Sequence, residues 1–499
     1  MSMRCLKFFN AASFLSFMYS LESSFLLKVL IVINKIDYFS IRQLALIFTL
    51  ALISGCSSIP TMVPDMAMHS ARPVQLDGAS GPLSPQQSKA ILAKLKKNGD
   101  DTNIFDKHLV LEAEIVGSPL VVGNHVELLV DGPTTYNSMF AAIEAAKDHI
   151  NMETFIIEND EVGQRFIDLL VSKQRSGVQV NLIYDSVGSM NTPKEFFMPL
   201  IENGGYVLEF NPINPLYARK SWQVSQRDHR KLLIVDGEIA FVGGINISSV
   251  YSSGSPGSGS FRKSKSTEGK VQWRDTHLRM AGPVVKEFQK LFIGTWEQQN
   301  GAPLPVKNYS PEIASKGNEI VRAIGSSPEE PFSQIYATLL SAINSAETQV
   351  FLTNAYFVPD PQLLAALKEA SQRGVDVRLL LPGKTDSTLV FYASRSYYDE
   401  LLSSGVKIYE RQHALLHAKT ALIDGVWSTI GSTNLDWRSF VNNQEINAVM
   451  LGQDFGAKMQ TLFEKDLESS KAITLEAWRS RSISVRIKER AARLWARLL

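Results

Sequence analysis

Two short stretches of the 499-residue chain carry the same reactive side chains at the same spacing. The first reads DHRKLLIVDGEIAFVGGINIS and the second reads LHAKTALIDGVWSTIGSTNLD. The shared residues are His229, Lys231 and Asp236 in the first stretch, and His417, Lys419 and Asp424 in the second. Because the chain has only 8 His, two chance matches to His-x-Lys-x4-Asp at equivalent positions are improbable, and the pair predicts a shared chemistry.

The side chains themselves indicate what that chemistry is. A neutral imidazole is a nucleophile, an imidazolium protonates a leaving group, and a lysine ammonium stabilises negative charge. Residues two apart share one face of a strand, so each His is expected to project together with its Lys. Asp236 and Asp424 belong to the candidate catalytic motifs, but their odd spacing from the His places them on the opposite face, where we expect them to brace the scaffold.

Each motif follows a longer segment, and the two segments repeat each other in sequence pattern. Residues 139–160 align at an offset of 200 with residues 339–360, and each segment reads as a helix followed by a strand. A second helix and strand follow in residues 166–184 and in residues 363–381. The alternation of helix and strand predicts an α/β fold in each half.

The composition is that of an ordinary globular protein with more than one domain, with 44% hydrophobic and 20% charged residues. A net charge of only +1 excludes a strong overall positive field for holding a nucleic acid backbone. Cys5 and Cys56 are the only cysteines, so a disulfide framework is excluded as well.

The chain resembles the phospholipase D superfamily, and within it the bacterial cardiolipin synthases, over roughly residues 120–470. The resemblance rests on the two His-x-Lys-x4-Asp motifs, the turns GGINIS and GSTNLD, and the segments WRDTH, NAYFVPD and LDWRSFVNNQE. It implies two α/β repeats, each a mixed β-sheet flanked by helices, packed about a pseudo-dyad with one active site between them. It implies no cofactor and no metal, and we expect activity in a chelator such as EDTA.

The resemblance also implies roles for individual residues. A phosphodiester repels nucleophiles through its own negative charge, so Lys231 and Lys419 would supply positive charge around the phosphoryl oxygens. His229 would form a phosphohistidine, and His417 would act first as an acid and then as a base. Further donors to the substrate would be Asn246, Asn434 and Ser432.

A carboxylate behind each His would fix its tautomer and hold its ring. Glu445, 28 residues after His417, is expected to partner that His, and Asp275, 46 residues after His229, is expected to partner the first. The longer spacing in the first half matches a Ser-, Gly- and Lys-rich insertion, residues 252–266. This insertion reads as a flexible loop at the mouth of the site or, equally, as a surface linker.

The N-terminal region predicts a leader and a lipid anchor. Residues 41–56, IRQLALIFTLALISGC, combine one Arg, an apolar run and small residues before a Cys. This pattern resembles the bacterial lipoprotein signal, in which Cys56 is lipidated after residues 1–55 are removed; the alternative is an ordinary N-terminal anchor with an incidental Cys. Cardiolipin synthases commonly begin with transmembrane helices, so this departure leaves the membrane side and the substrate open.

The C-terminal tail predicts a basic amphipathic helix. Its apolar residues at helical spacing are Ile483, Ile487, Ala491, Leu494, Trp495 and Leu498, and the adjacent basic residues are Arg486, Arg490, Arg493 and Arg497. Such a helix lies on an anionic lipid surface or docks on the protein's own acidic body, residues 56–477, in which Asp and Glu outnumber Lys and Arg. The expected organisation is a leader (1–55), a preface (56–120), repeats (121–310 and 311–475) and the tail (476–499).

The leading functional prediction is a membrane-anchored phosphatidyltransferase of the cardiolipin synthase type. One phosphatidylglycerol would form a phosphatidyl-enzyme, the hydroxyl of a second would displace it, and glycerol would leave. The expected partners are the phospholipid and a membrane surface reached through Cys56 and the tail, in a bacterial lipoprotein facing the periplasm. Hydrolysis of a phospholipid is the alternative; a nuclease is disfavoured by the acidic body, and a non-catalytic lipid-binding module by the complete motifs in both halves.

Overall fold

The computed structural model describes residues 74–98, 102–214, 223, 225–252 and 272–499, all within one compact unit, Met62–Leu499. The predicted leader, Cys56 and nearly all of the predicted insertion lie outside the described residues.

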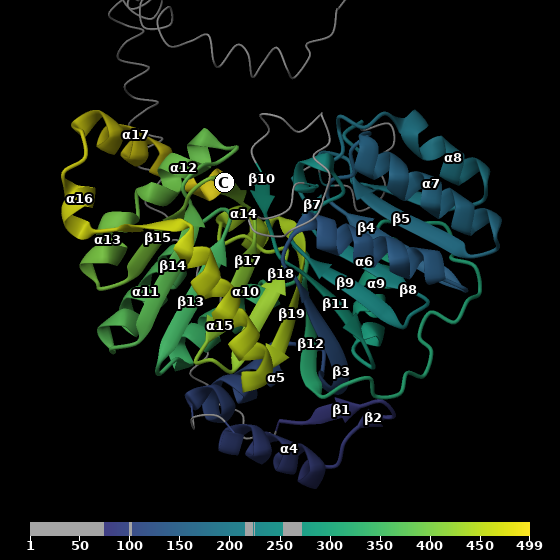
Figure 1. Cartoon of the computed structure of the whole chain (residues 1–499), viewed down its shortest axis with the longest axis horizontal. Coiled ribbons are helices and arrows are strands. Elements are labelled where there is room, and N and C mark those ends of the chain that lie inside the picture. The colour runs from purple at the N-terminus through teal and green to yellow at the C-terminus, as the bar shows by residue number, and fades with distance from the viewer. Residues whose placement is uncertain (1–73, 99–101, 215–222, 224, 253–271) are drawn as a thin grey trace, which may run out of the picture. The chain divides into compact units, whose positions relative to one another are not determined.

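One long mixed sheet runs through both halves of this unit (Figure 1). The strands of the first half are β3 (Leu120–Leu129), β4 (His149–Thr154), β5 (Gln179–Asp185), β6 (Tyr206–Phe210), β8 (Lys231–Val235), β9 (Ile239–Gly243) and β11 (His277–Ala281). Those of the second half are β12 (Glu319–Ser326), β13 (Gln349–Asn354), β14 (Asp376–Pro382), β15 (Lys407–Arg411), β17 (Lys419–Ile423), β18 (Trp427–Gly431) and β19 (Asn443–Leu451).

The order of the strands is the same in the two halves when each is followed inwards from β6 or from β15. The first half runs β6-β5-β4-β8-β9-β11-β3, and the second runs β15-β14-β13-β17-β18-β19-β12. The innermost strands, β3 and β12, pair antiparallel and join the halves. The predicted fold class, two α/β repeats with mixed sheets about a pseudo-dyad, is confirmed.

Helices cover the sheet, and those over residues 132–145, 161–175, 334–345 and 361–372 are the four that the repeat predicts. The main ones are α6 (Gly132–Ala145), α7 (Glu161–Arg175), α9 (Val285–Gln298), α10 (Gln334–Ser345), α11 (Pro361–Gln372) and α15 (Gln453–Glu468), with shorter α8 (Met198–Glu202), α12 (Thr388–Arg395), α13 (Tyr398–Ser403) and α14 (Trp437–Val441). Asp160 and Asp360, 200 residues apart, cap the N-termini of α7 and α11 through their side chains. The same local signal therefore starts the same helix twice.

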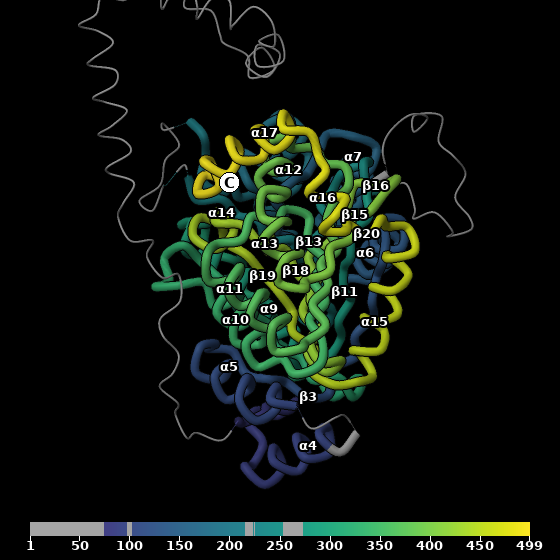
Figure 2. Tube along the Cα trace, turned by 90° about the vertical axis from the view of Figure 1, so that its left-hand side faces the viewer, coloured from purple at the N-terminus to yellow at the C-terminus, as the bar shows by residue number. Residues whose placement is uncertain are grey.

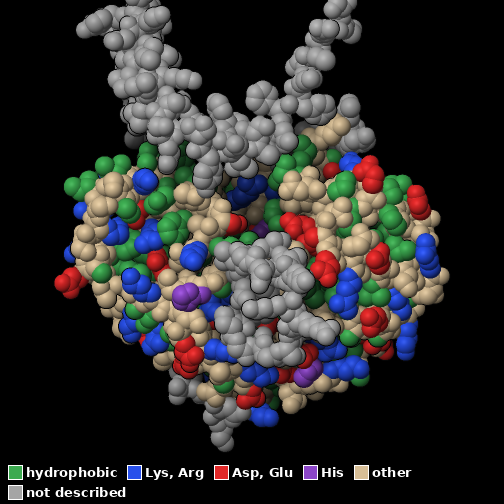
Figure 3. All heavy atoms as spheres, turned by 45° about the horizontal axis from the view of Figure 1, so that its top comes forward, with side chains coloured by type: hydrophobic (Ala, Val, Ile, Leu, Met, Phe, Trp, Pro, Cys, Tyr) green, Lys and Arg blue, Asp and Glu red, His purple; other side chains and the backbone are tan. Residues whose placement is uncertain are grey.

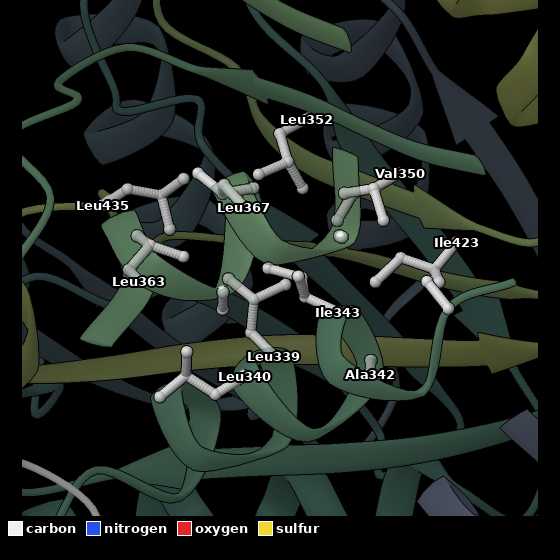
Figure 4. Close-up of a cluster of buried hydrophobic side chains, with 14 of the residues drawn as sticks. Leu339, Leu340, Ala342, Ile343, Val350, Leu352, Leu363, Leu367, Ile423 and Leu435 are labelled. Atoms are coloured by element: carbon white, nitrogen blue, oxygen red, sulfur yellow. The ribbon is translucent and has the colours of Figure 1, made fainter. Parts of the chain in front are cut away.

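The core forms where these helices bury their apolar sides on the sheet. Figure 4 shows leucines and isoleucines of α10 and α11 meeting Val350 and Leu352 of β13. Leu363, Leu367 and Ile343 are fully buried there, and each such side chain contributes about 1.5–3 kcal/mol of burial free energy. This packing fixes the parallel strands whose carboxyl ends carry the site.

The N-terminal preface adds a small layer at the junction of the halves. It consists of β1 (Leu76–Gly78), β2 (Gly81–Pro82), α4 (Pro85–Asn98), the π-helical turn η2 (Ile104–His108) and α5 (Leu109–Ile115). Its longest helix, α4, is formed by the segment PQQSKAILAKLKKN. β1 pairs in parallel with β3, and Arg322 of β12 donates to the carbonyl oxygen of Glu112 in α5.

The tail forms β20 (Ser470–Ile473), α16 (Leu475–Arg479), α17 (Ile483–Arg493) and the short η6 (Ala496–Leu498). β20 pairs with β15, and α17 lies over α12 both in the cartoon and in the view turned by 90° (Figures 1 and 2). Glu489 and Ala492 are buried in this contact, and Arg493 pairs with Glu400 at 2.7 Å. The tail is helical over Ile483–Arg493, a shorter range than predicted, and α17 packs on the protein through a side other than its apolar one. None of the described helices is long and apolar enough to cross a membrane.

Candidate active site

His229 is held by a strand of the other half. The short β7 (Arg227–Asp228) pairs in parallel with the start of β19, and the N–H of His229 donates to the carbonyl oxygen of Gln444 at 2.9 Å. Continuing this register by one residue brings His229 opposite Glu445. Its Nδ1 lies 3.0 Å from both carboxylate oxygens of Glu445, whose side chain is fully buried.

His417 is held in the same way by the first half. β16 (Ala414–Leu416) pairs in parallel with β10 (Gln272–Arg274), and the N–H of His417 donates to the carbonyl oxygen of Arg274 at 2.8 Å. The next residue along is Asp275, and its Oδ2 lies 2.7 Å from Nδ1 of His417. Each imidazole therefore turns Nδ1 to a buried carboxylate and leaves the lone pair on Nε2 for chemistry.

The carboxylates are thus exchanged between the halves. The prediction that Glu445 partners His417 and that Asp275 partners His229 is wrong, because spacing along the chain was counted within each half. The strand that precedes each His pairs with a strand of the opposite half. The residue directly after the paired positions, Glu445 or Asp275, therefore comes from the opposite half too. Burial lowers the pKa of each His, and the Lys of the opposite half is close enough for its charge to lower that pKa as well, so both histidines belong to one site between the repeats.

Lys231 and Lys419 lie beside the imidazoles and are nearly inaccessible. Each Nζ donates to the carbonyl oxygen of the His two residues before it, at 2.6 Å for Lys231 and 2.5 Å for Lys419. Burial, and then the charge of Lys419, lowers the pKa of Lys231 to about 7, and burial lowers the pKa of Lys419 to about 8. Two buried lysine side chains with lowered pKa values can bind an anion, because the negative charge of the anion stabilises their protonated forms and raises both pKa values again.

The imidazoles are neutral in the free site. Burial lowers the pKa of His229 to about 4 against the pull of Glu445, and burial followed by Lys419 lowers the pKa of His417. Burial acts to raise the pKa of Glu445, but His229 and Lys231 outweigh it and hold the pKa at about 2. A neutral His beside an ionised carboxylate is a nucleophile ready at neutral pH.

Four aromatic side chains that sequence reasoning missed line the histidines. The ring centroid of Phe155 lies 4.9 Å from that of His229. The ring centroids of Trp273 and Tyr356 lie 5.2 Å and 6.3 Å from that of His417. The Tyr251 hydroxyl lies 3.2 Å from Nδ1 of His417. Two of them stand inside WRDTH and NAYFVPD, so their nearness to the motifs was a usable signal.

The predicted substrate donors are corrected in part. Ser432 is fully buried and its hydroxyl donates to Glu445, so it holds the carboxylate rather than the substrate. Asn246 accepts from the N–H of Ile156 and donates one amide N–H to the Tyr251 hydroxyl; its amide has a second N–H, and its role toward the substrate stays a prediction. Asn434 is buried with an Oδ1 that has no hydrogen-bond partner among the described residues, and its role remains a prediction.

Asp236 and Asp424 are structural residues. Asp236 accepts from the backbone N–H groups of residues 147–149 at 2.8–3.1 Å, and Asp424 accepts from those of residues 347–349 at 2.8–3.2 Å. Both have positive φ, 54° and 49°, in the turn after their strand. They tie that turn to the start of β4 or β13, as the spacing predicted, and their place in the candidate catalytic set is corrected.

Within the described ranges, no three His, Cys, Asp or Glu side chains are grouped to hold a metal ion.

Comparison with known proteins identifies the family of the chain. The family model described as cardiolipin synthase, PLD-like domain, matches residues 139–255 and 339–467. The fold is similar to that of phosphatidylserine synthase from Haemophilus influenzae Rd KW20, with a TM-score of 0.59 and 13% identity over 78% of this chain and 99% of that one, which supports the fold alone. The chain is thus an enzyme of the phospholipase D superfamily.

Two relatives narrow the family. The chain is 36% identical to a cardiolipin synthase of Geobacillus sp. (strain WCH70) over 393 residues, which cover 78% of this chain and 76% of the relative. It is also 36% identical to that of Listeria monocytogenes serotype 4b (strain CLIP80459), over 77% of each chain. The chain belongs to the cardiolipin synthase family.

Proposed function

We propose that this enzyme joins two phosphatidylglycerols into cardiolipin through a phosphohistidine. The observation that carries the proposal is the exchanged pair of histidines, each with Nδ1 on a buried carboxylate of the other half and with a buried Lys close by. This arrangement supplies a nucleophile, an acid and a positively charged cradle for one phosphodiester.

In the first step, Nε2 of His229 attacks the phosphorus of one phosphatidylglycerol. A P–N bond forms, the P–O bond to the glycerol headgroup breaks, and His417 gives its proton to the departing oxygen. Because His417 is neutral in the free site, the negative charge of the bound substrate has to raise its pKa. Lys231 and Lys419 stabilise the charge on the phosphoryl oxygens.

In the second step, the headgroup hydroxyl of another phosphatidylglycerol gives its proton to His417. Its oxygen forms a P–O bond, the P–N bond breaks, and His229 is restored as cardiolipin leaves. Water attacking in place of the alcohol would give phosphatidic acid, the hydrolytic alternative. The burial of both imidazoles, 7% and 6% exposed, favours transfer because little water reaches the phosphorus.

Labelled phosphatidylglycerol tests the proposal. We expect labelled cardiolipin and one glycerol per cardiolipin, unchanged by EDTA, and no product from His229→Asn. With His417→Asn, a short-chain substrate bearing a good leaving group should trap an acid-labile phosphatidyl-enzyme. Phosphatidic acid as the sole product would mean a phospholipase, and no turnover of any phospholipid would overturn the proposal.

Membrane attachment is a second part of the proposal. We infer that Cys56 carries a lipid, that the protein is a lipoprotein facing the periplasm, and that the tail helix contacts anionic lipid. Support comes from the lipoprotein-like signal in residues 41–56 and from the exposed apolar side of α17. Mass spectrometry of the mature N-terminus tests the first point: a diacylated Cys56 is expected, and an unmodified Cys56 with residues 1–55 retained would contradict it.

A further inference from the structure

The exposed apolar side chains of this protein are strongly segregated. Twelve large hydrophobic residues are exposed within the described part of the chain. Six of them lie in segments that connect strands at the edge of the sheet where the histidines lie. Five lie in the tail, which packs on one of those segments, and only Val306 lies elsewhere. Scattered exposed apolar residues need no explanation, but this concentration does.

The first group is on the tail. The tail patch consists of Ile483, Ile487, Leu494, Trp495 and Leu498, which are 55–85% exposed. Arg486, Arg490 and Arg497 are exposed beside it, and no described residue forms an ion pair with them. An apolar ridge flanked by unneutralised arginines is complementary to the interface of an anionic bilayer.

The second group is on the first half. The tail packs on α12, in the connection that follows β14, and the second group lies mainly in the equivalent connection, which follows β5. The first-half patch consists of Met190, Met198, Ile201 and Ile213, which are 41–54% exposed. These residues belong to the connections that follow β5 and β6, as α12 follows β14. Met198 and Ile201 also line an open groove of about 450 Å³ with Phe197 and Val207.

The two patches flank the site. Figure 1 shows α17 and α8 along the same upper side of the unit, to the left and to the right of its centre. Figure 3 turns this side forward and shows a hollow near its centre, with Lys or Arg and His side chains inside and hydrophobic side chains on both flanks. Strand topology agrees, since Thr154 and Asn354 end β4 and β13 next to Lys231 and Lys419.

We propose that this face docks on a phospholipid bilayer through both patches at once, so that the mouth of the active site opens onto the lipid headgroups. This inference rests on the proposed function and extends it, because the tail alone would tether the enzyme without orienting it. Two contacts on opposite sides of the mouth fix the orientation, and lipid can then enter and leave without crossing water.

Site-directed nitroxide labels test the geometry in the full chain carrying Cys5→Ser and Cys56→Ser. The labelled variants are Met198→Cys, Leu494→Cys and, as the matched control, Val306→Cys. With vesicles containing phosphatidylglycerol, we expect oxygen accessibility to rise and nickel accessibility to fall at positions 198 and 494, while position 306 stays aqueous.

Each other outcome overturns the proposal in a defined way. A membrane signal at 494 alone would leave only a tail tether. A signal at neither position would remove the docking face, and protection at both without vesicles would assign the face to a second copy of the chain or to its own N-terminal region.

Activity provides a second measurement. Met198→Ser with Ile201→Ser, and Leu494→Ser with Trp495→Ser, should each slow turnover of phosphatidylglycerol in vesicles by roughly tenfold or more. Val306→Ser should have no effect, and all variants should act normally on monomeric short-chain phosphatidylglycerol. Normal vesicle rates in both patch variants would overturn the docking face, whereas failure of the unmodified enzyme on the monomeric substrate would overturn the proposed function instead.

Discussion

The two halves of the molecule are alike in their strands and unlike at their histidines. Both place His, Lys and a bracing Asp at the same points of the same sheet. His229 faces Phe155 and Glu445, whose carboxylate accepts from Ser432. His417 faces Asp275, Tyr251, Trp273 and Tyr356. The repeated scaffold thus places Lys231 and Lys419 alike to stabilise negative charge. The different surroundings of His229 and His417 allow these two imidazoles to have different roles.

The carboxylates show how the difference is built. Gly244 and Ser432 occupy equivalent places, 188 residues apart, in the turns GGINIS and GSTNLD. Ser432 donates to the longer Glu445, while a Cβ at Gly244 would meet Oδ1 of Asp275 at 2.2 Å. The shorter Asp275 side chain therefore needs the space that the missing Cβ leaves, and the longer Glu445 leaves room for a supporting hydroxyl.

Exchanging the carboxylates for amides should give the largest effect. Glu445→Gln and Asp275→Asn are each expected to lower kcat by roughly 10²- to 10⁴-fold, because an amide favours the wrong tautomer of the imidazole. Nitrogen-15 NMR should show that Glu445→Gln lowers the pKa of His229 further and leaves His417 unchanged, and that Asp275→Asn does the reverse. Effects on the His of the same half would contradict the exchanged pairing.

Gly244→Ala and Ser432→Ala should then distinguish the two ways in which the turns hold the carboxylates of Asp275 and Glu445. Gly244→Ala forces Asp275 from His417, so we expect kcat to fall by roughly 10- to 100-fold. Ser432→Ala removes one hydrogen bond to a carboxylate and should cost tenfold or less. Thermal unfolding serves as the control, and equal losses in the two variants would refute the proposed difference between the turns.

The lysines should set the alkaline limit of activity. With pKa values of about 7 and about 8, Lys231 loses its proton before Lys419, so kcat/KM should fall as the pH rises through 7 and more steeply above 8. Calorimetry with tungstate at pH 8 in buffers of different ionisation enthalpy should show proton uptake. Binding without proton uptake would contradict the lowered pKa values.

The same shifts predict the sign of a stability change. Lysine in the unfolded chain has a pKa near 10.5, so between about pH 7 and 10.5 the unfolded state binds more protons than the folded one. The contribution of Lys231 and Lys419 to the free energy of unfolding therefore rises with pH over this window and is at its lowest below pH 7.

Tyr251→Phe should give the smallest effect. Its hydroxyl accepts from Asn246 and contacts His417, so its loss should change kcat by about threefold to tenfold and shift one limb of the pH profile, with little change in KM. Phe155→Leu, next to His229, is the matched control in the other half. Identical pH profiles for Tyr251→Phe and the unmodified enzyme would show that the tyrosine only fills space.

The amino-acid sequence by itself determined the repeat, the helix and strand alternation and the faces of the motif residues. These are local properties, because periodicity, capping by Asp160 and Asp360, and the two-residue spacing of His and Lys act within a few residues. Only the tertiary structure decided which carboxylate meets which His, since the partners are 216 and 142 residues apart. It also decided how Ser432 is used and which side of α17 stays exposed, because both depend on which strands and helices pack together.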